Sequence, residues 1–350
     1  FALFKEGIVR FDTPHLGAYF ATMVVFWLAV PWGAARRLIP AVGAVALLAV
    51  AVPLQLHDDP GQAWDLLNGV DNVHRAYDQA DLLVHPDERS QAAAEAAVIM
   101  AVGYGIDPRM LSELEGHSVA IDPWEIAVVW TYQLDWSPLP VFQNYSAYTA
   151  KLDQLNAERI ASPEGPEMIL RQNPAKGLSQ YPTRTIDRRY PAWDPPAQAL
   201  ATLCNFAPLR TTKRWQLLER VPDRCAEPQP IGSVESSYGE TVLVPQAPRG
   251  AVVFVRIHGA EVSGLESLRS LLYRAKPRYA VVDGGDRFRL IPGTAGDGLL
   301  LRGEPQLTGA GLLAQAPQAK SIELTGLAGD LRYDFYSMAL DDQAAQSGGN

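Results

Sequence analysis

The sequence contains few of the residues that build metal clusters, disulfide-rich modules and nucleic-acid sites. Its 350 residues include only two cysteines and six histidines, and the histidines are scattered along the chain. Two cysteines exclude a cysteine-only zinc cluster and a disulfide-dense miniprotein. No long basic run occurs and the formal net charge is −9, so nucleic acid is not expected as a partner.

Common catalytic signatures are also missing. The sequence contains no HExxH, CxxC or GxSxG motif and no Walker loop. No glycine-rich phosphate loop follows any expected strand, so no cofactor is predicted. A divalent cation remains an alternative to the absence of a cofactor. Three aspartates could bind calcium, although their positions in turns account for them equally well: Asp283, Asp286 and Asp297.

Two apolar runs without a charged residue stand out near the beginning of the chain. They cover about residues 16–32 and 38–56, within an otherwise polar segment 1–57. Each is close to the ~20 residues that cross a lipid hydrocarbon core. The pattern predicts two transmembrane helices that form a hairpin. A buried hairpin of a soluble protein and a signal peptide are the alternatives.

The charges around these runs predict their orientation. Arg36 and Arg37 between them favour a cytoplasmic loop, which places residues 58–350 outside the cytoplasm of a multi-pass protein of the cell membrane. Lys5 and Arg10, before the first run, oppose this assignment. The chain starts at Phe1, so we expect the C-terminal part of a longer polytopic protein.

Residues 58–221 alternate between strand and helix patterns. Strands are expected at 118–121, 139–142, 167–170 and 215–218, and helices at 123–134, 149–161 and 195–204. Three Asp-Pro pairs, at Asp107, Asp122 and Asp194, resemble helix starts in which the carboxylate caps the helix. The alternation predicts an extracytoplasmic α/β domain of three layers with a mostly parallel sheet.

Polar and aromatic residues follow the expected strands of this domain. Ligands usually bind beyond the carboxyl ends of parallel strands, and amides, rings and carboxylates are groups that bind sugars. The candidates are Asp122, Trp124, Glu125, Gln143, Asn144, Tyr145 and Tyr148, with Arg171, Gln172 and Asn173 after the third strand.

These candidates have structural alternatives. A capping box accounts for Asp122 and Glu125 without any ligand. Tyr145 and Tyr148 fit packing as well as binding, and Trp130 and Tyr132 are expected in the core. Outside the cytoplasm, Cys204 and Cys225 are expected to form a disulfide; two buried free thiols are the alternative.

The last third of the chain has a β pattern. Residues 222–240 are rich in proline, serine and glycine and predict a linker. Eight short strands then predict a jelly-roll-like β-sandwich over residues 241–340, including one strand at 268–274. Residues 341–350 are expected to be a disordered tail.

Charged residues before the first apolar run form a candidate collar at the membrane edge. Lys5 and Arg10 could bind the phosphate of a lipid-linked sugar, and Asp12 and His15 could exchange a proton with a sugar hydroxyl. Glu6 lies among them. An ordinary charged collar that anchors a helix is the alternative.

The collar also carries a resemblance to known proteins. A pattern FKxGFVRxDxxH is matched by Phe4, Lys5, Gly7, Val9, Arg10, Asp12 and His15, with Ile8 in place of its Phe. Together with DPWE, PVFQNYSAYT, LDQLNA and IDRRYPAWDPP, it resembles bacterial polytopic membrane proteins grouped with C-type glycosyltransferases or envelope polysaccharide polymerases. That resemblance implies a catalytic aspartate upstream of Phe1, so no catalytic residue is assigned.

Two functions follow as expectations. The first is the C-terminal part of a cell-envelope enzyme of glycosyltransferase or polymerase type, acting on lipid-linked sugars, with outer domains that position or bind glycan. Its partners would be membrane lipid or lipid-linked sugar, and glycan. The second is a non-catalytic, membrane-anchored sugar-binding or scaffold protein.

Overall fold

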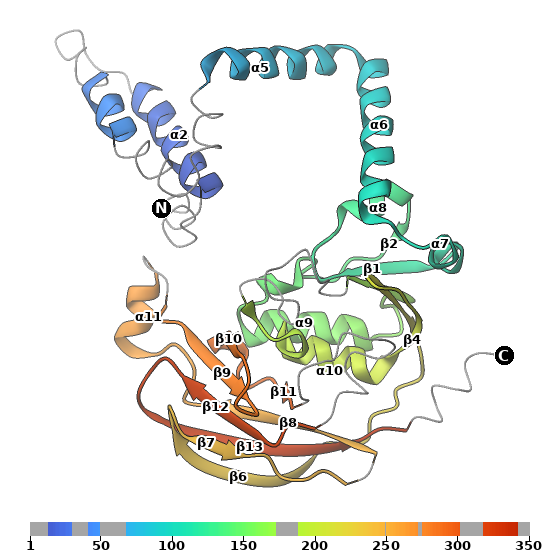
Figure 1. Ribbon diagram of the computed structural model, residues 1–350, viewed down its shortest axis with the longest axis vertical. Coiled ribbons are helices and arrows are strands. Elements are labelled where there is room, and N and C mark those ends of the chain that lie inside the picture. Colours follow the sequence, from blue (N-terminus) through green and yellow to red (C-terminus); the bar gives the residue numbers. More distant parts are fainter. Residues whose placement is uncertain are drawn as a thin grey trace. The chain divides into compact units, whose positions relative to one another are not determined.

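The computed structural model of the chain describes residues 13–29, 41–49, 68–172, 188–248, 250–271, 275–301 and 318–341. Contacts divide the chain into two compact units (Figure 1). The first unit comprises residues 1–94 with 263–275, and the second comprises residues 95–262 with 276–350.

The described part of the first unit is helical. Its elements are α2 (Thr13–Ala29), a helix over residues 41–49, α5 (Gly69–Val84), the beginning of α6 (Pro86–Tyr104) and α11 (Gly264–Ser270). Helix α11 occupies residues expected to form a strand at 268–274, so that expectation is wrong where the two overlap.

The predicted membrane hairpin is wrong. Within the described ranges, no helix has both the length and the apolarity needed to cross a membrane. Helix α2 has 17 residues, and the second apolar run is described as helix only over residues 41–49, short of the ~20 residues a span requires. The multi-pass localisation and the extracytoplasmic placement of residues 58–350, which rested on that hairpin, are corrected with it.

The second unit begins with a mixed sheet. Its strands, in the order β2-β1-β3-β5-β4, are β2 (Asp135–Trp136), β1 (Ser118–Asp122), β3 (Met168–Gln172), β5 (Trp215–Arg220) and β4 (Phe206–Thr211). Strand β1 runs parallel to β2 and β3, but β5 runs antiparallel to both β3 and β4. A tight connection joins β4 to β5, which permits antiparallel pairing, so the prediction of a mostly parallel sheet does not hold.

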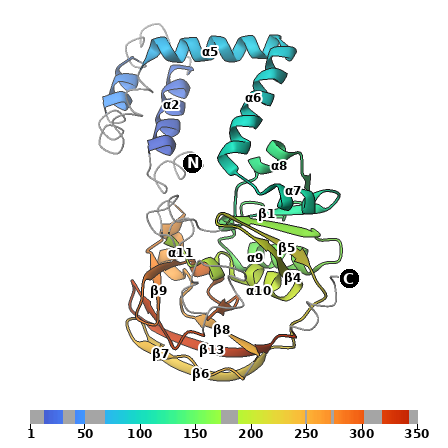
Figure 2. The ribbon, with the colours of Figure 1, turned by 45° about the vertical axis from the view of Figure 1, so that its right-hand side comes forward.

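Helices cover both faces of this sheet because its buried strands present apolar side chains on alternate sides. Val119 and Ile121 pack with α7 (Pro108–Leu114) and α8 (Ala127–Tyr132). Ala120 packs on the opposite face, which is covered by α9 (Ala150–Ala161) and α10 (Pro196–Asn205). Figures 1 and 2 show α9 and α10 between this sheet and the strand β8 of the following part.

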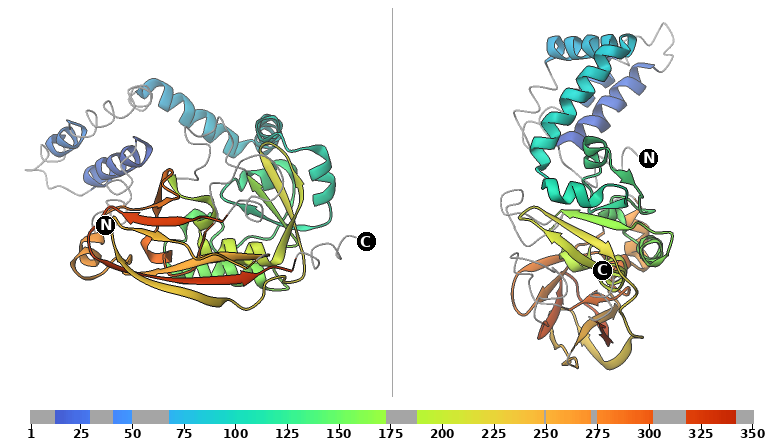
Figure 3. Two further views of the ribbon diagram at one scale, coloured as in Figure 1. Left: turned by 60° about the horizontal axis from the view of Figure 1, so that its bottom comes forward. Right: turned by 90° about the vertical axis from the view of Figure 1, so that its right-hand side faces the viewer.

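Eight further strands form two antiparallel sheets around one shared core. One sheet has the order β10-β9-β12-β7 and the other β11-β8-β13-β6. The strands are β6 (Gln229–Ser237), β7 (Thr241–Leu243), β8 (Ala251–His258), β9 (Arg278–Val282), β10 (Arg287–Leu290), β11 (Leu299–Leu300), β12 (Ser321–Thr325) and β13 (Asp330–Ala339). The long strands β6, β8 and β13 run side by side (Figure 3).

The predicted combination of a transmembrane hairpin, a mostly parallel α/β domain and a jelly-roll-like β-sandwich is therefore wrong. The described residues form no transmembrane hairpin, and the three sheets are one mixed and two antiparallel. Strand β6 also occupies about half of the segment expected to be a linker (residues 222–240). Its residues are largely exposed, so the sequence shows no clear apolar alternation there. The predicted tail beyond Asp341 lies outside the described residues.

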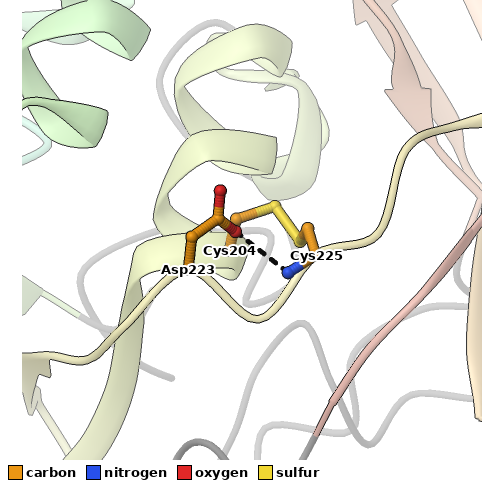
Figure 4. Close-up of side chains that lie close together, drawn as sticks. All are labelled: Cys204, Asp223 and Cys225. Carbon is orange, nitrogen blue, oxygen red and sulfur yellow. Dashed lines mark hydrogen bonds between the residues drawn. A yellow bond between two sulfur atoms is a disulfide. The ribbon is translucent and has the colours of Figure 1, made fainter.

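Cys204 and Cys225 are joined by a disulfide (Figure 4). Cys204 lies near the end of α10, and Cys225 forms a β-bridge with Leu340, after the last strand. The backbone N–H of Cys225 also donates to Asp223 Oδ1, at 2.9 Å. The disulfide thus connects the end of α10 to the segment before β6, and that segment pairs with the residue after β13.

Candidate functional site

The candidate site lies at the carboxyl edge of the parallel strands β1 and β3. Asp122 ends β1 and pairs in register with Arg171 of β3. Asn144 begins the short 3₁₀ helix η2 (Asn144–Ser146), and its backbone N–H donates to the carbonyl of Pro123 at 3.2 Å. Three chain segments that are far apart in sequence therefore meet at this edge.

Both oxygens of Asp122 are engaged at this edge. Arg171 Nε donates to Asp122 Oδ2 at 2.6 Å, and Asn144 Nδ2 donates to Asp122 Oδ1. The paired side chains are only 15% and 11% exposed for Arg171 and Asp122. Because each of its oxygens accepts one of these bonds in a largely buried setting, Asp122 fixes the geometry of the edge.

The predicted capping box at this point is wrong. Helix α8 starts at Ala127, its N-cap is Ile126, and no side chain caps it. Asp122 instead accepts hydrogen bonds from Arg171 and Asn144. Glu125 lies beside the amide of Gln172. The first Asp-Pro pair behaves as expected, because Asp107 Oδ1 accepts from the backbone N–H of Arg109 at 2.8 Å.

An aromatic pair stands beside this locked carboxylate. The rings of Trp124 and Tyr145 pack edge to face, with centroids 5.9 Å apart and planes at 85°. The Tyr145 hydroxyl donates to Gln143 Oε1 at 3.2 Å. All three side chains are half-buried, so part of each ring and of the amide faces outward.

A second polar group flanks the pair. In the Gln172 amide orientation that satisfies both of its polar atoms, the nitrogen donates to Glu125 Oε1 at 3.2 Å and the oxygen accepts from Arg214 Nε at 3.3 Å. Arg214 also stacks over the ring of Tyr104, with 5.7 Å from Cζ to the centroid. Partial burial, reinforced by the Glu125 carboxylate, raises the pKa of Tyr104. Glu125 is thus the half-exposed carboxylate of the edge.

Buried residues fix the loop that carries Gln143, Asn144 and Tyr145. Asn156 of α9 binds both backbone groups of Val141, accepting from its N–H at 2.8 Å and donating to its carbonyl at 3.0 Å. These bonds replace the strand expected at 139–142. The loop is therefore attached to α9 immediately before the candidate residues.

Arg189 fixes the other end of the same loop. Its Nη1 donates to the Tyr145 carbonyl at 2.6 Å and to Asp194 Oδ1 at 2.7 Å, and its Nη2 donates to the Tyr148 hydroxyl at 2.9 Å. Arg189 and Asp194 are almost fully buried. Tyr148 therefore serves this scaffold, whereas Tyr145 contributes to the edge. The 3₁₀ helix η4 (Pro191–Trp193) follows Arg189, and Trp193 Nε1 donates to the Leu300 carbonyl at 2.8 Å.

The structure brings eight of the sequence candidates together: Asp122, Trp124, Glu125, Gln143, Asn144, Tyr145, Arg171 and Gln172. The collar residues Lys5, Glu6, Arg10 and Asp12, as well as Asn173, lie outside the described residues, and His15 lies in α2 of the first unit. Sequence reasoning missed Arg214, which lies in the connection before β5. It also misplaced Trp130, which was expected in the core but is 61% exposed.

Two groups of described residues could supply metal ligands. One comprises Asp81, His85 and Glu88, and the other Cys204, Asp223 and Cys225. The second contains the disulfide, whose sulfurs are not thiolates. The suggested calcium set is not brought together in the described part of the chain: Asp283 accepts from the backbone N–H groups of Lys320 and Ser321, at 2.6 and 2.9 Å.

Comparison with known proteins places the chain in no family. No protein-family model matches it, and neither the curated proteins nor the solved structures contain a significant match. The resemblance to C-type glycosyltransferases and envelope polysaccharide polymerases is therefore corrected, since no family and no membrane-crossing helix in the described part of the chain supports it. Two of the stretches that carried it, LDQLNA and IDRRYPAWDPP, contain residues with a structural role: Asn156, Arg189 and Asp194 are buried and fix the loop before and after Tyr145.

Proposed function

We propose that this protein binds glycan without transforming it, at the carboxyl edge of β1 and β3. The observation that supports this most directly is the Trp124–Tyr145 pair, held half-exposed beside Gln143 and Glu125. Aromatic faces pack against the C–H faces of sugar rings, and amide and carboxylate groups bind sugar hydroxyls. Aromatic side chains beside a few placed polar groups are typical of small-ligand recognition.

The electrostatics of the edge favour binding over catalysis. Asp122 is committed to Arg171 and Asn144, and Glu125 contacts the Gln172 amide. General acid–base catalysis needs a proton-transfer group that reaches the reacting atom. Neither carboxylate is arranged for that role, whereas both hold their surroundings in a fixed geometry, which lowers the entropic cost of binding.

The proposed partner is a glycan, and the net charge of −9 supports it over nucleic acid. The proposal assigns no role to a metal ion. We therefore expect that treatment with EDTA leaves glycan binding unchanged, as measured by calorimetry before and after dialysis. Loss of binding that is restored by calcium would contradict this part of the proposal.

The test is a glycan array probed with the full chain, followed by calorimetry with the glycan that gives the strongest signal. Trp124→Ala should weaken binding about tenfold, because one aromatic contact contributes roughly 0.5–1.5 kcal/mol beyond its buried area. The matched control is Leu243→Ala, which truncates an apolar side chain that is 76% exposed on β7.

Two results would overturn the proposal. One is equal binding by Trp124→Ala and the Leu243→Ala control, or no binding by the wild type. The other is release or transfer of sugar by the wild type that is abolished in Glu125→Gln, since this would make Glu125 a catalytic residue.

A further inference from the structure

Three aromatic rings form an exposed row next to the candidate site. The row consists of Trp130 from α8, Trp136 at the end of β2, and Phe142 from the following loop. Ring centroids are 6.0 Å apart between Trp130 and Trp136 and 6.1 Å apart between Trp136 and Phe142, with planes at 61° and 80°. Trp130 is 61% and Phe142 43% exposed. Such an arrangement leaves much apolar ring surface in water, which usually marks an interaction site.

The row is held in place by the fold. Trp136 pairs in register with Val119 of β1 and packs partly against the apolar core on the α8 side of the sheet. Phe142 follows Val141, both of whose backbone groups are bonded by Asn156. Edge-to-face contacts between the rings add to this restraint. The rings are therefore arranged before any ligand arrives, which lowers the entropic cost of binding.

The row continues into the candidate site. Strand β2 pairs in parallel with the beginning of β1, where Trp136 is in register with Val119, so the connection to the site runs through the loop that follows β2. Phe142 directly precedes Gln143, which accepts a hydrogen bond from Tyr145. On this short loop, the Gln143 amide therefore lies between Phe142 of the row and Tyr145 of the Trp124–Tyr145 pair.

We propose that the row Trp130–Trp136–Phe142 extends the glycan site, so that the protein binds several consecutive units of a glycan chain. This inference rests on the proposed function. A single sugar ring can use one aromatic set at a time, whereas two sets separated by a polar amide match a chain of linked rings. The polar residues around the row are Gln133, Asp135 and Ser137, which are exposed or half-buried and suited to hydroxyl groups more than to an apolar protein surface.

The test measures affinity against chain length. Calorimetry is performed with glucose, mannose, arabinose and N-acetylglucosamine oligomers from the monomer to the hexamer, using the full chain. The wild type should bind the hexamer of one series more tightly than its dimer. Trp130→Ala and Phe142→Ala should each weaken hexamer binding about tenfold and should affect the dimer less. Trp130→Tyr should restore most of the hexamer affinity, since it keeps a ring.

The possible failures can be told apart. If the wild type binds oligomers and Trp124→Ala weakens every length, but Trp130→Ala and Phe142→Ala keep the full length dependence, the extended site is wrong and the proposed function stands. If no oligomer binds, both are wrong. If Trp130→Ala converts a dimer of the chain into a monomer in sedimentation, with no change in glycan binding, the row is a contact between copies. Leu243→Ala again controls for loss of an exposed apolar side chain.

Discussion

At the scale of single residues, Asp122 shows how a polar group near a site can be structural. Its two oxygens accept from Arg171 and Asn144 in a largely buried setting. Removing one member of a buried ion pair leaves the other charge desolvated without compensation. The pair therefore matters for the integrity of the edge.

We predict that Arg171→Leu lowers the free energy of unfolding by about 3 kcal/mol. The control is Arg332→Leu, because Arg332 pairs with Asp334 at 2.9 Å but is 49% exposed, and exposed pairs contribute about 0–1 kcal/mol. Urea denaturation of both variants provides the measurement. Equal effects of the two substitutions would show that the Asp122 pair is not buried in the way described.

At the scale of elements, the N-terminus of α10 is capped by a side chain from another helix. Asp153 of α9 is fully buried and accepts from the backbone N–H groups of Ala197 and Gln198, at 2.8 and 2.9 Å. Burial and the neighbouring Asp297 carboxyl raise the pKa of Asp153 to about 7, although the two N–H donors act against this shift. Asp297 lies between the 3₁₀ helix η5 (Pro292–Thr294) and β11, so the two carboxyls join α9 to the antiparallel part.

We predict that stability falls as the pH rises through this window. The folded-state pKa of Asp153 is raised to about 7, above its unfolded value of about 3.9. The folded state therefore binds more protons, and its extra stability is present below about pH 4 and is lost as the pH rises to about 7. Asp297→Asn should reduce this loss, because it removes one of the two causes of the shift.

Urea denaturation of the wild type and of Asp297→Asn between pH 4.5 and about 8.5 tests the linkage. Asp135→Asn, at an exposed position of β2, is the control and should retain the wild-type slope. A slope in Asp297→Asn that is identical to that of the wild type would show that the Asp297 carboxyl does not raise the pKa of Asp153.

The same elements show what the sequence could and could not predict. Local patterns were sufficient for β1, β3, β5 and β8, whose apolar runs are short and bounded. They were insufficient for the Asp-Pro pairs. Asp107 caps a helix, whereas Asp122 bonds to Arg171, 49 residues away, and Asp194 to buried Arg189. A partner as distant in sequence as that of Asp122 leaves no local signal, whereas Arg189 lies only five residues before Asp194.

The candidate site was predictable in part for the same reason. Strand ends and the residues that follow them can be read from the sequence, and eight of those candidates do meet at one edge. The exposed ring of Trp130 could not be anticipated, because its neighbours Val128 and Val129 are buried and an apolar helix of six residues predicts burial all round. The alternation within β6 was likewise hidden by its exposed residues.

At the scale of the whole second unit, both cysteines of the disulfide pack in the core that the two antiparallel sheets share. Cys204 and Cys225 are separated by 21 positions. In the chain-entropy model, closing a loop of this length stabilises the folded state by about 3 kcal/mol. We predict a loss of that size in the double variant Cys204→Ala, Cys225→Ala, measured by denaturation. A variant as stable as the wild type, together with free thiols in non-reduced peptides of the wild type, would contradict the structure at this point.

The central claim is that the carboxyl edge of the mixed sheet is the binding surface of this protein. Hydrogen–deuterium exchange of the full chain, with and without the glycan that binds most tightly on the array, tests this claim directly. The account predicts slower exchange in two segments, residues 122–126 and 136–145, and little change in the strands β6, β8 and β13. Protection confined to those three strands, or no protection anywhere at saturating glycan, would contradict it.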